Sequence, residues 1–432
     1  MEHTQRDYWR FYWPLALIGV VAVAGRLAQN RVLLGYAEGT RELAQFTIAL
    51  AIFQPFRSAL IFVPQMSNVL VRGPKSFRSS VRFLCTVAAA LTLPAVLLGW
   101  TPLGGWLLPL FYDFAPDRIA GIQAYLRYFA PLILMGAGAG FLTGLLVQSM
   151  RTGMATVLGV SRIVMLIGVV GLGARAGWPP VVTLSCSMLL AGAGHLALAA
   201  LLYAKYGKAP PAGEDRRLTQ RETAAFFLPM VATTILFSIS RPIIYAFLTS
   251  LNPTGDRSLP NVDAMVSAVG LAFTLNMGFQ LTVNQFRNVL VTFGDQDPAG
   301  VRRFIWRVAF GLSVVMVAAV ASPFVRWFLH DLQNAEGELL RMARQAVWPL
   351  VLAPVIVTWR NYYHGLAMVH RRTAGMAVGG LARVGSVWVC ARLLTALGLY
   401  NHVAAAAMLV VAFAAEAGTT MLFTRRWRAE LA

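Results

Sequence analysis

Long apolar runs alternate with short polar breaks along the whole chain. Each run has about 20 residues or more, the length that a helix needs to cross a hydrocarbon core of roughly 30 Å. This pattern predicts twelve membrane-spanning helices. They lie at about residues 11–31, 45–70, 82–110, 121–149, 155–174, 180–203, 222–250, 262–292, 303–330, 340–370, 374–397 and 402–424. With 57% hydrophobic and only 13% charged residues, we expect an all-α polytopic membrane protein.

The polar breaks alternate in charge. Basic residues dominate the breaks at 72–82, 205–221, 302–303 and 371–372 and the tail at 425–428, whereas most acidic residues occupy the breaks between these. By the positive-inside rule, both termini and the basic loops are predicted to be cytoplasmic, in a bacterial-type inner (plasma) membrane. The net charge of +19 follows from these dispersed loops, so we expect the lipid bilayer, and no nucleic acid, as a partner.

The two halves of the chain repeat each other. The polar stretch 205–221 lies at the midpoint and predicts a cytoplasmic linker between an N-terminal six-helix bundle, residues 1–204, and a C-terminal one, residues 222–432. Matching pairs are Pro14 and Pro229, Asn68 and Asn288, Pro102 and Pro323, Trp106 and Trp327, Gly144 and Gly365, and Arg162 and Arg383. Because each half holds six spans, the halves should form parallel bundles related by a pseudo-twofold axis, with a cleft between them.

Polar side chains within the spans are the candidate site. An arginine at the centre of a membrane helix costs roughly 2.5–3.5 kcal/mol, so it needs a cavity, a partner or a route to the headgroups. The predicted substrate-binding residues are Arg26, Asn30, Arg57, Arg241, Gln280, Asn284, Arg287, Arg360, Asn361 and His364. Glu416 is the one carboxylate placed deep in a span, and it is the candidate for coupling. A single acid cannot neutralise the deep arginines, so we expect a small anionic substrate.

These residues also have structural interpretations. Arg287 lies near a span end and could extend to the headgroups. Arg26 and Arg241 could bond backbone carbonyls at broken helices. His364 could be a packed neutral histidine, and Glu416 could make a structural hydrogen bond.

Enzymatic chemistry has no support in the sequence. It contains no nucleotide-binding glycine motif, no paired catalytic carboxylates and no His or Cys cluster with metal-ligand spacing. The cysteines Cys85, Cys186 and Cys390 lie far apart in apolar runs. We therefore expect a protein that is not an enzyme and has no cofactor or metal. We also expect it to be a monomer.

Several short stretches resemble the progressive ankylosis (Ank) family, within the multidrug/oligosaccharidyl-lipid/polysaccharide exporter superfamily, whose MATE members give the fold its name. They are Phe237 to Ile244 around Arg241-Pro242, Val357 to Arg360 continuing to Thr373, Gln29-Asn30-Arg31, Arg287-Asn288-Val289, and Glu416 with Thr419-Thr420-Met421. The resemblance implies an outward carrier of pyrophosphate, ATP and citrate-like anions. It carries over functional roles to Asn30, Arg31, Arg241, Arg360 and Glu416. Arg26 departs from it, because an acidic residue is expected there.

These observations predict export of polyanions by alternating access. In an inside-negative cell, a trivalent anion that moves outward gains about 7 kcal/mol per 100 mV, so no coupling ion is needed. A lipid-linked oligosaccharide flippase is the first alternative, because its pyrophosphate headgroup also suits an arginine-rich cleft. A multidrug cation antiporter is weaker, since it needs buried carboxylates, and a membrane scaffold with purely structural arginines is the third alternative.

Overall fold

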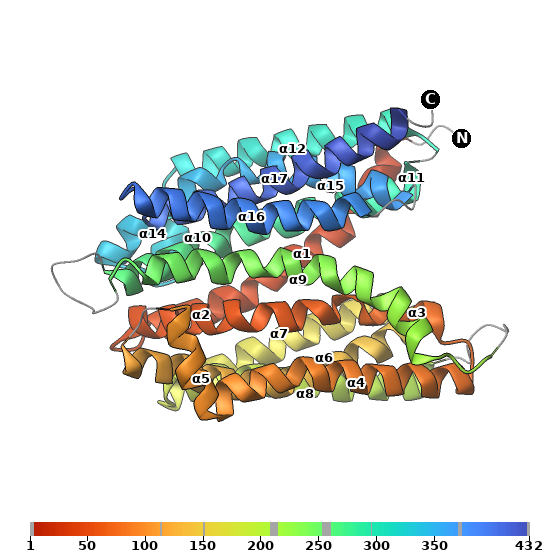
Figure 1. Ribbon diagram of the computed structural model, residues 1–432, viewed down its shortest axis with the longest axis horizontal. Helices are drawn as coiled ribbons and strands as arrows, with labels where there is room; N and C mark the ends of the chain where they lie inside the picture. The colour runs from red at the N-terminus through yellow and green to blue at the C-terminus, as the bar shows by residue number, and fades with distance from the viewer. Residues whose placement is uncertain are drawn as a thin grey trace. The chain divides into compact units, whose positions relative to one another are not determined.

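The computed structural model describes residues 4–112, 115–149, 152–207, 215–252, 261–294, 296–369 and 374–429. Within these ranges all regular structure is helical, as predicted (Figure 1). The helices are α1 (Gln5–Leu34), α2 (Gly39–Ser58), η1 (Ala59–Phe62), α3 (Val63–Leu70), α4 (Pro74–Trp100), α5 (Pro102–Leu107), η2 (Leu108–Leu110), α6 (Pro116–Gln148), α7 (Thr152–Arg175), α8 (Pro180–Tyr206), α9 (Gln220–Thr249), α10 (Val262–Val283), α11 (Phe286–Phe293), α12 (Pro298–Ala321), α13 (Phe324–His330), α14 (Gly337–Leu350), α15 (Ala353–Val369), α16 (Ala374–Ala396) and α17 (His402–Ala429).

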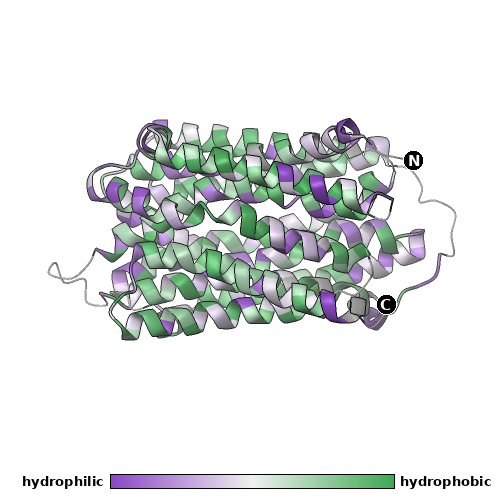
Figure 2. Cartoon of the chain, turned by 90° about the horizontal axis from the view of Figure 1, so that it is seen from above, coloured by the Kyte–Doolittle hydropathy of each residue, from purple (hydrophilic) through white to green (hydrophobic). Residues whose placement is uncertain are grey.

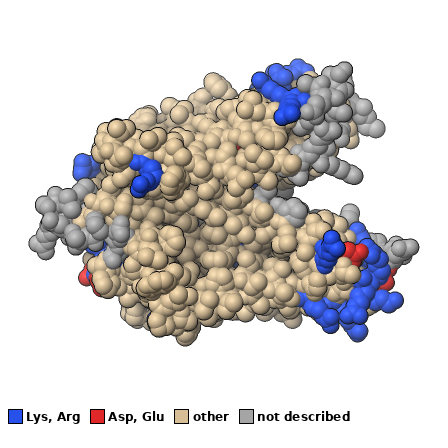
Figure 3. All heavy atoms as spheres, in the orientation of Figure 1, with Lys and Arg blue, Asp and Glu red and all other residues tan. Residues whose placement is uncertain are grey.

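The long helices fall in the twelve predicted segments. In the described part of the chain, nine helical spans are long and apolar enough to cross a membrane, and α14 with α15, bent by 42°, makes a tenth. The helices α1 and α9 have 30 residues each and occupy the other two segments. Figure 2 shows hydrophobic colour along the helices, and Figure 3 shows charged side chains gathered at helix ends on the face that it draws. This distribution suits helices whose flanks contact lipid.

The chain divides into two compact units, which do not coincide with the two predicted halves. Unit 1 comprises Met1–Thr47 and Ser240–Ala432, and unit 2 comprises Ile48–Ile239. The transitions therefore lie inside α2 and α9 and not at the predicted linker, of which residues 208–214 lie outside the described part. The reason is that α1 packs on α10, α11 and α12, which come from the second half of the sequence.

Aromatic side chains fix α1 in unit 1. Tyr12 stacks on Phe286, with ring centroids 5.1 Å apart, and contacts Phe304 edge-on at 5.8 Å. The Tyr8 hydroxyl donates a hydrogen bond to Asp297 at 2.5 Å. Aromatic pairs of this kind contribute about 0.5–1.5 kcal/mol beyond the area that they bury. The start of α1 thus lies at the same end of unit 1 as the start of α12.

Unit 2 contains α4, α6, α7 and α8, in which α6 packs on each of the other three and α7 packs on α8.

Asp215, which follows the undescribed part of the linker, caps the start of α4. Its carboxylate accepts hydrogen bonds from the backbone N–H groups of Lys75 and Ser76 and from the Ser76 hydroxyl, each at 2.9 Å. The backbone hydrogen bonds from Lys75 and Ser76 hold the pKa of Asp215 below its ordinary value.

The sequence repeat has a structural counterpart in helix lengths and breaks. The eight-residue helices α3 and α11 correspond, as do the short helices α5 and α13. The turns before α8 and α17 match residue by residue. Gly177 has φ +69° and Gly398, 221 positions later, has φ +67°. Such backbone conformations favour glycine, so the same helix-ending turn has been kept in both units.

A second glycine pair explains why α6 and α15 can approach their neighbours closely. A Cβ atom at Gly144 would lie 1.9 Å from the Ser67 hydroxyl and 2.2 Å from the Pro64 carbonyl, both in α3. At Gly365 it would lie 2.7 Å from the Leu290 side chain in α11. The repeated glycines therefore mark equivalent helix crossings, one in each unit.

Candidate functional site

A buried charge network lies between α15, α16 and α17 in unit 1. The Glu416 carboxylate accepts a hydrogen bond from Arg383 at 3.0 Å, and it lies 3.7 Å from Nη1 of Arg360 and 3.4 Å from Nε2 of His364. All four side chains are at most 6% exposed. The Arg383 Nε also donates to the Ser240 hydroxyl at 2.9 Å. Burial at this level makes each charge dependent on its partners.

The break between α10 and α11 brings further predicted residues to this network. Asn284 ends α10, and its side-chain oxygen accepts hydrogen bonds from Arg360 at 2.9 Å and from Asn361 at 3.0 Å. Arg287 directs its Nε to the Asn284 backbone carbonyl at 3.5 Å. The structure therefore joins Asn284, Arg287, Arg360 and Asn361 at one place, because a broken helix frees backbone and amide groups to position guanidinium groups.

Two sequence-based expectations need correction here. Arg360 is not without a counter-charge, since Glu416 lies within ion-pair distance. Glu416 is held mainly by Arg383, which the sequence identifies only as the repeat partner of Arg162 and not as a site residue. The position of Arg383 deep within α16 could have identified it as a site residue, because a buried arginine needs a partner. The cluster nevertheless keeps an excess of cations: Arg287, Arg360 and Arg383 face one carboxylate among the described residues.

A second group in unit 1 holds Arg26 of α1 and Arg241 of α9. The Arg26 guanidinium lies 4.8 Å from the centre of the Phe46 ring, and that of Arg241 lies 5.2 Å from the Phe273 ring. The two guanidinium groups are close enough for their like charges to repel each other, and both interact electrostatically with Tyr245. Within the described residues, neither has a carboxylate within 4.0 Å, and the buried Nη1 atom of Arg26 has no hydrogen-bond partner.

Asn30 and Gln280 are the two remaining predicted residues of unit 1. Asn30 is fully buried and donates hydrogen bonds to Thr274 at 3.2 Å and to Gln333 at 2.8 Å, so it connects α1 with α10 and with the segment after α13. Gln280 is 7% exposed on α10. Asn276, one turn earlier, is fully buried, and its amide has no hydrogen-bond partner in the described ranges.

Arg57 is the one predicted site residue of unit 2. It is exposed near the end of α2, and its charge interacts with that of Arg162 on α7. Arg162 also interacts with His195 on α8, and both are half-buried. No ion pair joins these three side chains to a carboxylate that the structure describes.

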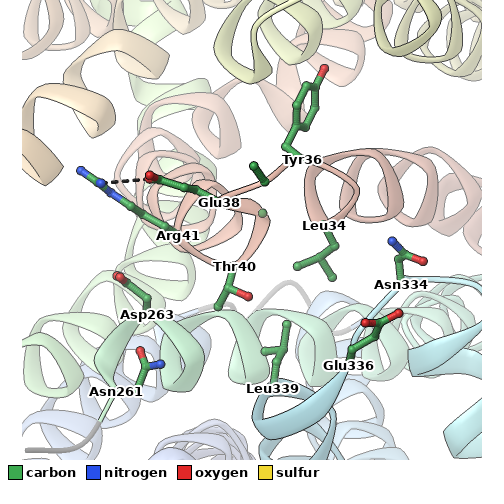
Figure 4. A pocket seen from close by; sticks show the side chains of 12 residues that line it. Leu34, Tyr36, Glu38, Thr40, Arg41, Asn261, Asp263, Asn334, Glu336 and Leu339 are labelled. Carbon is green, nitrogen blue, oxygen red and sulfur yellow. Dashed lines mark hydrogen bonds and ion pairs between the residues drawn. The ribbon is translucent and has the colours of Figure 1, made fainter. Parts of the chain in front are cut away.

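A cavity of about 530 Å³ opens in unit 1 where α1 ends and where α2, α10 and α14 begin (Figure 4). Its lining includes Glu38, Arg41, Asp263 and Glu336, and Arg41 pairs with Glu38 at 3.0 Å. None of the predicted substrate-binding residues lines it. The loops after α1, before α10 and before α14 meet here, so three of the acidic breaks read from the sequence share one end of this unit.

Comparison with known proteins identifies the fold. No protein-family model and no curated protein matches the sequence. A eukaryotic MATE transporter structure aligns with a TM-score of 0.66 at 12% identity, covering 99% of this chain and 100% of that one. A multidrug resistance MATE transporter of the MOP superfamily in an inward-facing conformation gives 0.64 at 14%, covering 96% and 98%. A MOP superfamily transporter from Pyrococcus furiosus gives 0.64 at 16%, covering 99% and 96%.

These likenesses show the fold, and they confirm the predicted fold class. The chain is an all-α, multi-pass membrane protein with a MATE-like fold. At such identities, function has to be argued from the residues of this chain.

Proposed function

We propose that the protein is a secondary transporter that exports polyanions of the citrate, ATP or pyrophosphate class by alternating access. The observation that carries the proposal is the pair Arg26 and Arg241. Both lie in predicted membrane spans, their charges interact, and neither has a carboxylate partner within the described residues.

Two neighbouring guanidinium groups repel each other in a medium of low dielectric constant. An anion bound to both would remove this repulsion, and guanidinium forms paired hydrogen bonds to carboxylate or phosphate oxygens. Phe46 and Phe273 already contact one face of each group. Each of these cation–π contacts contributes about 0.5–2 kcal/mol, which is less than a counter-ion would supply. The two arginines would therefore still be stabilised by a bound anion.

The chemistry of Glu416 argues against a multidrug cation antiporter. Such a carrier requires a deep carboxylate that is available to a cation. Glu416 is held by Arg383 and lies within 4.0 Å of Arg360 and His364. A cationic drug at this position would lie beside three basic side chains and only one carboxylate, so the net electrostatic interaction would be repulsive. We keep Glu416 as the coupling candidate, although outward movement of a polyanion needs no coupling ion in an inside-negative cell.

Two likenesses agree with an anionic substrate. The resemblance of the Arg241-Pro242 and Arg360 stretches to the Ank family implies export of pyrophosphate, ATP and citrate-like anions. The Pyrococcus furiosus structure is described as having a binding pocket of reverse polarity that suggests a different function. Pocket polarity therefore varies within this fold.

We also propose that the protein is a monomer in a bacterial-type inner membrane. The positions of the basic loops favour an orientation with both termini in the cytoplasm.

Efflux from liposomes tests this proposal. Purified protein would be reconstituted into vesicles loaded with radiolabelled citrate, ATP or pyrophosphate, with an outward driving potential set by potassium and valinomycin. We expect efflux of at least one of these anions, and a loss of about tenfold or more in Arg241→Gln and in Arg26→Gln, because each removes a charge-assisted contact.

Arg302→Gln is the matched control, since Arg302 is exposed at the start of α12. Its efflux should equal that of the unchanged protein. Undiminished efflux in both Arg241→Gln and Arg26→Gln, with insertion intact, would disprove the site. Transfer of a fluorescent lipid-linked oligosaccharide between leaflets, without efflux of any free anion, would favour the flippase instead.

A further inference from the structure

The internal repeat allows one unit to be interpreted from the other. The turn before α8 and the turn before α17 have the same hydrogen bonds, 221 positions apart. The Trp178 N–H donates to the Gly173 carbonyl at 3.0 Å, and the Leu399 N–H donates to the Leu394 carbonyl at 2.8 Å. Both turns contain a glycine with positive φ, and both lead into unbroken helices. The residue register between the two helix pairs is therefore fixed.

This register gives each member of the ion pair in unit 1 a counterpart in unit 2. Arg383 of α16 corresponds to Arg162 of α7, and Glu416 of α17 corresponds to His195 of α8. In unit 1 the two positions form a buried ion pair at 3.0 Å. In unit 2 the arginine is kept, but a neutral or cationic ring replaces the carboxylate. The charge that balances the arginine in unit 1 therefore has no equivalent in unit 2.

Arg57 adds to this imbalance. Its charge interacts with that of Arg162, and neither side chain forms a hydrogen bond or ion pair with another residue that the structure describes. The Arg57 side chain is exposed and those of Arg162 and His195 are half-buried, so each keeps surface that a bound group could contact. Two guanidinium groups and an imidazole together offer several N–H donors and no competing acid.

We propose that Arg57, Arg162 and His195 form an oxyanion subsite in unit 2, in which one carboxylate or phosphate group of the transported anion takes the place that the Glu416 carboxylate takes in unit 1. This inference rests on the proposed function, because it assumes that the anion is the substrate. It assigns anion binding to residues of unit 2, whereas the Arg26 and Arg241 pair belongs to unit 1.

The repeat itself supplies the decisive variant. His195→Glu places a carboxylate opposite Arg162, as Glu416 stands opposite Arg383, so the internal carboxylate should exclude an external oxyanion. We expect the affinity for citrate and for pyrophosphate, each measured by isothermal titration of the full chain in detergent, to fall about tenfold or more. Arg162→Gln should lower it similarly. His195→Gln, which adds no charge, should stay within about threefold of the unchanged protein.

Each result supports or overturns the subsite. A selective loss in His195→Glu and Arg162→Gln, with His195→Gln preserved, supports it, and the loss for citrate or for pyrophosphate shows which oxyanion it takes. Unchanged affinity in His195→Glu overturns it, and if efflux still depends on Arg241, the proposed transport function stands. If His195→Glu does not fold, Arg162→Gln alone decides by the same threshold. If the unchanged protein neither binds nor exports these anions, both proposals fail.

Discussion

Replacing Glu416 should destabilise the protein more than replacing Arg383, although the two form one ion pair. Glu416→Gln leaves two guanidinium groups, those of Arg383 and Arg360, without the carboxylate that now lies 3.0 Å and 3.7 Å from them. Arg383→Gln leaves Glu416 with Arg360 still in reach. The exposed fraction of each side chain is at most 5%, so water cannot compensate for the lost charge.

Removing one partner of a buried ion pair costs about 3–5 kcal/mol of unfolding free energy. We expect Glu416→Gln at the upper end of this range and Arg383→Gln at the lower end. In the double variant the loss should be smaller than the sum of the two single losses, because the two residues interact directly and a coupling of about 0.5–3 kcal/mol is typical of such pairs. Reversible unfolding in mixed detergent micelles, followed by circular dichroism, measures these differences.

Glu338→Gln serves as the control, because Glu338 pairs with Arg341 at 3.8 Å on an exposed helix face. Exposed pairs of this kind contribute about 0–1 kcal/mol. If Glu416→Gln unfolds with the same free energy as this control, or if Arg383→Gln is the more destabilised single variant, then the charge network does not stabilise unit 1 as we argue.

Three further outcomes follow from local geometry. Gly144→Ala should destabilise more than Gly365→Ala in the same unfolding assay, by about 1–3 kcal/mol, because backbone and the bonded Ser67 hydroxyl block the new methyl group at the first position and only a leucine side chain does so at the second. Gly398→Ala should cost about 1 kcal/mol, since φ is +67° there and no steric contact opposes the methyl group. The lowered pKa of Asp215 means that its carboxylate stabilises the fold above about pH 4 and that this contribution is lost as the pH falls through the lowered pKa. Unfolding midpoints of Asp215→Asn should therefore depend less on pH below about 4 than those of the unchanged protein.

Much of the architecture was readable from the sequence because hydrophobic length is a strong local signal. The twelve segments and the glycine pair Gly144 and Gly365 appear as patterns in the chain, and the structure has helices and crossings at these places. A helix in lipid must satisfy its own backbone, so apolar length alone determines its existence.

The sequence also identified the polar residues of the spans, but it could not assign their partners. It named Glu416 and Arg360 without joining them, and it passed over Arg383, which the fold places 3.0 Å from Glu416. It placed α1 with the first half, whereas Tyr8 and Tyr12 pack on helices of the second. Contacts between residues tens to hundreds of positions apart depend on how helices pack, which a hydropathy pattern does not encode. The sequence thus determined which helices exist and which charges they contain, and tertiary packing decided which charges are balanced.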